Sequence, residues 1–127
     1  MRRLSLIVLL CLLSVPAVAA GSARDFVVFF QDWSAALGPS AQHVIAHAAA
    51  WAKAHPQTPL TVSGAADRTG TRKANRLLSE LRAQVVTDQL AEDGIPEAGV
   101  RQVALGVVGH ALKSQASRRV IISFGAP

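Results

Sequence analysis

A long stretch of helix-forming residues places the strongest constraint on the fold of this chain. Residues 72–93 contain neither proline nor glycine, and Gly94 and Pro96 stop the run. Before it, a β-branched pair at 61–62 leads into Gly64. Apolar β-branched residues that end at a glycine favour a strand, whereas the uninterrupted run favours a helix. The sequence therefore predicts a strand, a short polar loop and a long helix, in that order.

The predicted helix carries polar residues on a side that should be apolar. Successive residues are about 100° apart around a helix, so side chains three or four positions apart share a face. The stripe expected to face solvent consists of Arg76, Glu80, Gln84 and Thr87. The apolar arc consists of Leu77, Leu78, Leu81, Ala83, Val85, Val86 and Leu90. Arg82 lies inside this apolar arc, with Asn75 and Ser79 beside it.

Arg82 needs an anion or a water-filled cleft, because burial of an unpaired guanidinium is unfavourable. Asp67 follows the predicted strand and lies close to the start of the predicted helix. Two interpretations are open. In one, Asp67 and Arg82 form an ion pair that fastens the loop to the helix. In the other, the two charges are held apart, and they bind the ammonium and the carboxylate of one zwitterionic ligand.

The first 20 residues are expected to form a secretory signal peptide. Two arginines precede an apolar run at 4–15, and the small residues that follow place cleavage after Ala19 or Ala20. An uncleaved membrane anchor is the alternative, and the shortness of the run argues against it. Cys11 is the only cysteine and lies in this segment, so no disulfide is expected in the exported part. The leucines around Cys11 also argue against lipidation there.

Length and charge limit what the remaining residues can do. Removal of 20 of the 127 residues leaves 107, which is enough for one domain at 21–127 with a modest core. It also removes two of the 13 basic residues, so 11 remain against 8 acidic residues, a net charge of +3. Such a balance does not favour nucleic-acid binding. After cleavage the chain is expected to have no membrane anchor of its own.

Periodicity and turn signals predict an α+β fold. Strands are expected at 26–30, 59–64, 100–105 and 118–124, helices at 40–54 and 72–93, and a glycine-punctuated connection at 106–117. The order is therefore strand, helix, strand, helix, strand, loop, strand. It predicts a two-layer sandwich in which both helices pack on one face of a small mixed sheet.

Catalytic and metal sites are not expected. His43 and His47 are four positions apart on the first predicted helix, a spacing that can chelate a metal, but the sequence places no third ligand with them. Ser63 and Ser79 have no evident base nearby, and no cysteine survives signal cleavage. The chain is therefore not expected to be an enzyme or to carry a cofactor.

These residues together resemble the OmpA-like domain that binds peptidoglycan in bacterial envelopes. The most specific part is Gly64-x-x-Asp67-x-x-Gly70 followed by Asn75-x-x-Leu78-Ser79-x-x-Arg82-Ala83. Further matches are Gly94-Ile95-Pro96, Gly106 and Arg118-Arg119-Val120. The resemblance covers the chain from Phe26 to Phe124.

The resemblance implies a ligand and roles for individual residues. In the OmpA-like family the ligand is diaminopimelate, the zwitterionic residue of the peptidoglycan stem peptide. By resemblance Asp67 binds its ammonium and Arg82 its carboxylate, while Asn75 and Thr69 shape the pocket. The implied location is the periplasm, peripheral to the outer membrane, with peptidoglycan as partner and other envelope proteins as further candidate partners.

The chain also departs from the family pattern around these two charges. The family usually has His-Thr at Ala65-Ala66, a polar residue at Leu81 and an asparagine at Ser117. A second hypothesis follows from these replacements. In it, the fold is retained as a structural or protein-interaction module of the periplasm that does not bind the cell wall.

Overall fold

The structure is a computed structural model, and it describes residues 23–68, 70–107 and 117–125 of the chain. Its elements are β1 (Arg24–Phe29), α1 (Pro39–Ala54), β2 (Leu60–Ala66), α2 (Arg72–Glu92), the 3-10 helix η1 (Glu97–Gly99), β3 (Val100–Val107) and β4 (Arg119–Phe124). The expected signal peptide and most of the expected connection at 106–117 lie outside the described residues.

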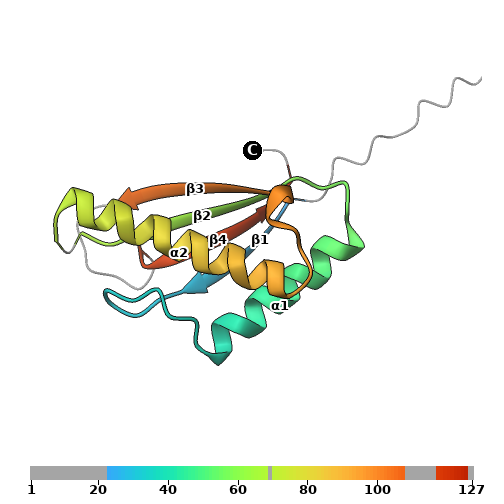
Figure 1. The fold of residues 1–127 in the computed structure, drawn as a ribbon, viewed down its shortest axis with the longest axis horizontal. Helices are drawn as coiled ribbons and strands as arrows, with labels where there is room; N and C mark the ends of the chain where they lie inside the picture. The colour runs from blue at the N-terminus through green and yellow to red at the C-terminus, as the bar shows by residue number, and fades with distance from the viewer. Residues whose placement is uncertain (1–22, 69, 108–116, 126–127) are drawn as a thin grey trace, which may run out of the picture.

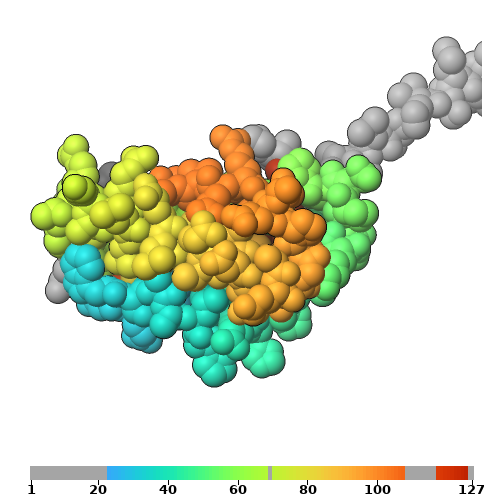
Figure 2. All heavy atoms as spheres, viewed as in Figure 1, coloured from blue at the N-terminus to red at the C-terminus, as the bar shows by residue number. Residues whose placement is uncertain are grey.

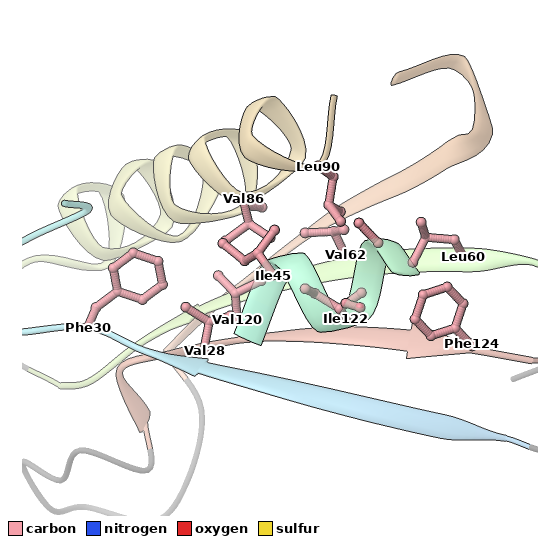
Figure 3. Packing of buried hydrophobic residues seen from close by; sticks show 13 residues of the cluster. Val28, Phe30, Ile45, Leu60, Val62, Val86, Leu90, Val120, Ile122 and Phe124 are labelled. Carbon is pink, nitrogen blue, oxygen red and sulfur yellow. The ribbon is translucent and has the colours of Figure 1, made fainter. Parts of the chain in front are cut away.

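The four strands form one mixed sheet in the order β1-β4-β2-β3. Strand β4 pairs antiparallel with β1 and with β2, whereas β2 and β3 are parallel neighbours. Helix α2 makes the crossover between β2 and β3 that a parallel pair requires. Both helices lie on one face of the sheet (Figures 1 and 3). The predicted α+β, two-layer fold is therefore confirmed.

Local signals explain where the two helices begin and end. Pro39 occupies the first turn of α1, where its missing N–H is not needed. The hydroxyl of Thr71 caps α2 by accepting a hydrogen bond from the backbone N–H of Ala74 at 3.0 Å. After α2, Gly94 adopts a φ of 99°, a left-handed conformation that glycine enters without strain.

The hydrophobic core lies between the sheet and the two helices (Figure 3). Alternate residues of β4 point into it, because successive strand side chains face opposite sides of a sheet. The buried members are Val28, Phe30, Ile45, Ala48, Ala49, Leu60, Val62, Ala83, Val86, Leu90, Val120, Ile122 and Phe124. The core therefore extends from one end of the sheet to the other and gives α2 a fixed position over β2.

Some local expectations were wrong. Strand β3 continues to Val107, two residues beyond its expected end at 105. Strand β2 does not end at Gly64 but continues to Ala66, because its pairing with β3 resumes after an irregularity and joins Ala66 to Val107. The face of α2 that packs on the sheet is also narrower than the apolar arc on the helical wheel.

Three residues of α2 show how its buried face differs from the expected apolar arc. Leu77 and Leu81 are 55% and 52% exposed, although both belong to the apolar arc. Thr87, expected in the solvent stripe, is buried and donates a hydrogen bond from its hydroxyl to the carbonyl oxygen of Ala83 at 2.9 Å. That bond satisfies the hydroxyl inside the helix, so Thr87 is compatible with burial.

Candidate functional site

The candidate site lies where the end of β2 meets the first half of α2. Here the helix approaches the strand closely, because Gly64 has no side chain. A Cβ atom at this position would clash with the carbonyl oxygen of Ser79 and lie 3.1 Å from the Cβ of Ala83. The glycine and the alanine of the motif are thus explained by one close contact between helix and strand.

Ser79 also ties α2 to the end of β3. Its buried hydroxyl donates to the carbonyl oxygen of Arg76 at 2.8 Å and accepts from the backbone N–H of Gly106 at 3.0 Å. Gly106 has a φ of 67°, which favours glycine at this position. The side chain of Ser79 therefore has a structural role and is not positioned as a nucleophile.

Arg82 is completely buried, and its guanidinium is committed to backbone carbonyls. Its Nε donates to the carbonyl oxygen of Ser34 at 2.8 Å, and its two terminal nitrogens donate to those of Ala65 and Gln31, each at 3.0 Å. Phe30 lies beside it, with its ring centre 5.2 Å from the guanidinium carbon. Hydrogen bonds from a charged donor are about twice as strong as neutral ones.

Through these bonds Arg82 joins the loop between β1 and α1 to β2 and α2. Figure 2 shows this loop, in cyan, lying against the first half of α2. Desolvation lowers the pKa of the Arg82 guanidinium from its ordinary value, the nearby carboxylate of Asp67 raises it, and Arg118 lowers it. Arginine stays protonated in proteins, so Arg82 brings a fixed positive charge to the interior.

Asp67 is 4% exposed and pairs with Arg118, which was not among the expected site residues. The distance from Arg118 Nη1 to Asp67 Oδ2 is 3.2 Å. Arg118 also donates from Nε to the carbonyl oxygen of Phe30 at 3.2 Å and lies 3.9 Å from Asp32. The match of Arg118-Arg119-Val120 to the family pattern pointed to this position.

The expected roles of the four site residues stay predictions, and the structure describes the places of three of them. Asp67 lies near Arg82, Asn75 lies about two helical turns before Arg82 on α2, and all three are buried. Thr69 lies outside the described residues. Of the two interpretations of the opposite charges, the described contacts match neither fully, because Asp67 pairs with Arg118 and Arg82 binds carbonyls.

A cleft of about 720 Å³ opens beside Asn75. It is lined by Arg68, Gly70, Arg72, Asn75, Arg76, Leu105, Gly106 and Val107, and these residues define the basic cleft. Its cations are exposed arginines, whereas Asn75 is 2% exposed. The cleft can therefore accept a small anionic or zwitterionic group from solvent.

Trp33, in the loop between β1 and α1, packs against the loop that follows β2. Its indole lies against Gly70, where a Cβ atom would clash with two ring carbons. Its own φ of 51° is uncommon for a residue other than glycine. Because Trp33 remains 52% exposed, it presents an aromatic surface near the loop that follows β2.

We expect the Asp67–Arg118 pair to stabilise the site measurably. Asp67→Asn should lower the free energy of unfolding by about 1–2 kcal/mol, because Arg118 keeps some solvent contact and one neutral hydrogen bond can remain. Urea denaturation of wild type, Asp67→Asn, Arg118→Gln and the double variant gives a double-mutant cycle, which measures the coupling free energy between the two side chains. A coupling energy near zero would show that the two side chains act independently.

The two histidines of α1 do not belong to a metal-ligand cluster among the described residues. His43 and His47 are both exposed on α1. Within the described ranges, no group of three or more potential ligands is arranged to hold a metal ion. No helix among those residues is long and apolar enough to cross a membrane.

Comparison with known proteins identifies the family. The chain is 34% identical to a peptidoglycan-associated lipoprotein of Brucella melitensis over 74% of its own length and 60% of that relative. It thus spans less than two thirds of the curated relative.

Solved structures support the same family assignment. The peptidoglycan-associated lipoprotein of Burkholderia pseudomallei superimposes with a TM-score of 0.69 and 29% identity, over 77% of this chain and 88% of that one. The OmpA-like domain of FopA1 from Francisella tularensis gives 0.72 and 25% identity, over 83% and 73%. A sequence model of the OmpA family matches residues 29–121, so the chain belongs to the OmpA family.

Proposed function

We propose that this protein binds peptidoglycan noncovalently in the cell envelope. The observation that carries the proposal is its 34% identity to relatives named peptidoglycan-associated lipoprotein, over 74% of the chain. The OmpA family is a family of binding and structural domains rather than of enzymes, as expected for this chain from its sequence. The proposed location is the periplasm, peripheral to the outer membrane, with other envelope proteins as further partners.

The proposed ligand within peptidoglycan is the diaminopimelate of the stem peptide. Asp67 would receive its ammonium, Arg82 its carboxylate, and the amide of Asn75 would hydrogen bond at the mouth of the pocket. Arg82 has five N–H groups, of which three donate to carbonyls. Direct contact with a ligand requires the loop at 31–34 to move, since Arg82 has no exposed surface.

A weak site is sufficient for this function. A few charge-assisted hydrogen bonds of about 1.5–3 kcal/mol each, reduced by the entropy lost on binding, correspond to micromolar to millimolar dissociation constants. Peptidoglycan repeats its stem peptide many times, so a released domain rebinds nearby. The affinity for the polymer therefore exceeds the affinity for one stem peptide.

Sedimentation with isolated peptidoglycan tests the proposal. Wild type should pellet with the wall material, and Asn75→Ala should bind about 3- to 10-fold more weakly, as expected for one lost hydrogen bond. The side chain of Asn75 makes no hydrogen bond to the described residues, so this variant should keep its melting temperature within a few degrees. Asp88→Asn, an exposed change farther along α2, is the matched control.

Two results would contradict wall binding. One is a wild type that stays in the supernatant. The other is a set of folded variants, Asn75→Ala, Asp67→Asn and Arg82→Lys, that all pellet as well as wild type.

One observation favours a second candidate function, a structural module without wall binding. Arg82 is fully buried, and its bonds to Gln31, Ser34 and Ala65 join three segments of the chain without any ligand. In that case Arg82→Lys should lower the melting temperature while the protein fails to pellet in every form. The same sedimentation experiment therefore separates the two candidates.

A further inference from the structure

The start of α2 carries an unusual concentration of positive charge. Arg72, Lys73 and Arg76 lie within its first five residues, and its first turn holds no acidic residue. The N-terminus of a helix is itself the positive end of the helix dipole, so cations there are unfavourable and anions favourable. Folding alone gives no reason for this arrangement, whereas a bound anion would relieve the repulsion.

The three arginines of the basic cleft converge from two segments. Arg68 follows β2, while Arg72 and Arg76 are four residues apart and share one face of α2. All three are exposed. Arg76 Nε lies 3.4 Å from Glu80 Oε1, but the side chains of this pair are 69% and 48% exposed, so solvent weakens the contact.

A buried polar group also faces the cleft. Asn75 is 2% exposed, lines the cleft, and its side chain makes no hydrogen bond to the described residues. Its amide N–H groups are therefore available to an acceptor in the cleft. Leu105 and Val107 line the same cleft and offer apolar contact to the carbon atoms of a ligand.

Arg82 contrasts with these groups, because it has no exposed surface and is bound to three carbonyls. We propose that the basic cleft is a second carboxylate site, which shares Asn75 with the proposed diaminopimelate pocket and in which Arg68, Arg72, Arg76 and Asn75 bind a further carboxylate of the peptidoglycan stem peptide. This inference rests on the proposed wall binding. Under this proposal, the charge of the stem peptide determines how tightly the protein binds peptidoglycan.

A carboxylate fits this cleft better than an uncharged group. A planar guanidinium donates two parallel hydrogen bonds to a carboxylate, and Asn75 can add a third donor. The N-acetylated sugars of the glycan strand are uncharged, so the anionic groups of the wall are the carboxylates of its peptides. Amidation of those carboxylates removes the charge and exchanges an acceptor oxygen for a donor.

The test compares two charge removals on the same helix turn. Arg72→Gln/Arg76→Gln removes two cations that line the cleft, and Lys73→Gln removes an exposed cation that does not line it. In sedimentation assays the double variant should bind peptidoglycan about tenfold more weakly than wild type, which corresponds to one charge-assisted contact. Lys73→Gln should stay within about twofold, since an exposed charge outside the site is screened by salt.

The second part of the test repeats the sedimentation with peptidoglycan whose carboxylates have been amidated. Wild type and the double variant should bind this material equally weakly, because the group that the arginines recognise is gone. If the double variant binds untreated peptidoglycan like wild type or like Lys73→Gln, the carboxylate site is wrong while wall binding stands. If wild type itself does not pellet, both proposals fail.

Thermal unfolding separates a binding role from a structural one. Arg72→Glu should raise the melting temperature by about 2–5 °C, because it replaces an unfavourable charge at the helix start. The same variant should bind peptidoglycan more weakly than Arg72→Gln does. A lower melting temperature together with unchanged binding would assign Arg72 to the fold and overturn the inference.

Discussion

Arg82→Ala will lower the free energy of unfolding by about 3–5 kcal/mol, comparable to removing one member of a buried ion pair. The substitution leaves the carbonyl oxygens of Gln31, Ser34 and Ala65 without their charged donor and opens a cavity beneath α2. Each buried acceptor that loses its donor is destabilising. The loop between β1 and α1 should also become susceptible to proteolysis, because two of the lost bonds hold it.

Urea denaturation measures this effect, and two further variants make it interpretable. Arg76→Ala, on the exposed side of the same helix, should change stability by no more than about 0.5 kcal/mol. Arg82→Lys keeps the charge but loses the planar fork that reaches three acceptors, so an intermediate loss is expected if Arg82→Ala does not fold. Equal denaturation midpoints for wild type and Arg82→Ala would contradict the structural role.

Gly64→Ala will destabilise the domain by about 3 kcal/mol, the upper end of the range for overpacked cores. The added Cβ atom would overlap the carbonyl oxygen of Ser79, which belongs to a helix backbone and cannot rotate away. Helix α2 would have to move from β2. Because Asn75 lies on that helix, peptidoglycan binding should weaken as the domain loses stability.

Gly99→Ala is the matched control for this prediction. A Cβ atom at Gly99 would meet no atom within 4 Å, so its effect should stay within about 0.5 kcal/mol. Thermal unfolding of both variants measures the difference. If Gly64→Ala is as stable as Gly99→Ala, the close approach of α2 to β2 does not limit the fold.

Much of this architecture follows from local sequence patterns. The run at 72–93 and its stop at Gly94 predict α2 to within one residue of its observed end at Glu92. Such patterns are informative because helix periodicity and stop signals act over a few neighbouring residues. The η1 turn at Glu97–Gly99 was not predicted, since single 3-10 turns carry no periodic signal.

The width of a buried helix face is harder to predict. Leu77 and Leu81 have the same character as the buried Leu90, yet more than half of each is exposed. An apolar side chain is suited to the core, but the position of the helix over the sheet decides whether that side chain is buried. That position depends on contacts such as Gly64 with Ser79, which join separate elements.

The sequence by itself determined the order of strands and helices, the family pattern and the position of Arg82 within the apolar arc of α2. Only the tertiary structure decided what the buried charges contact. Arg82 binds carbonyls 48 and 51 residues away, and Asp67 binds Arg118, also 51 residues away. The physical reason is that burial creates the need for a partner locally, whereas the partner is supplied by whichever distant segment the fold brings within hydrogen-bond distance.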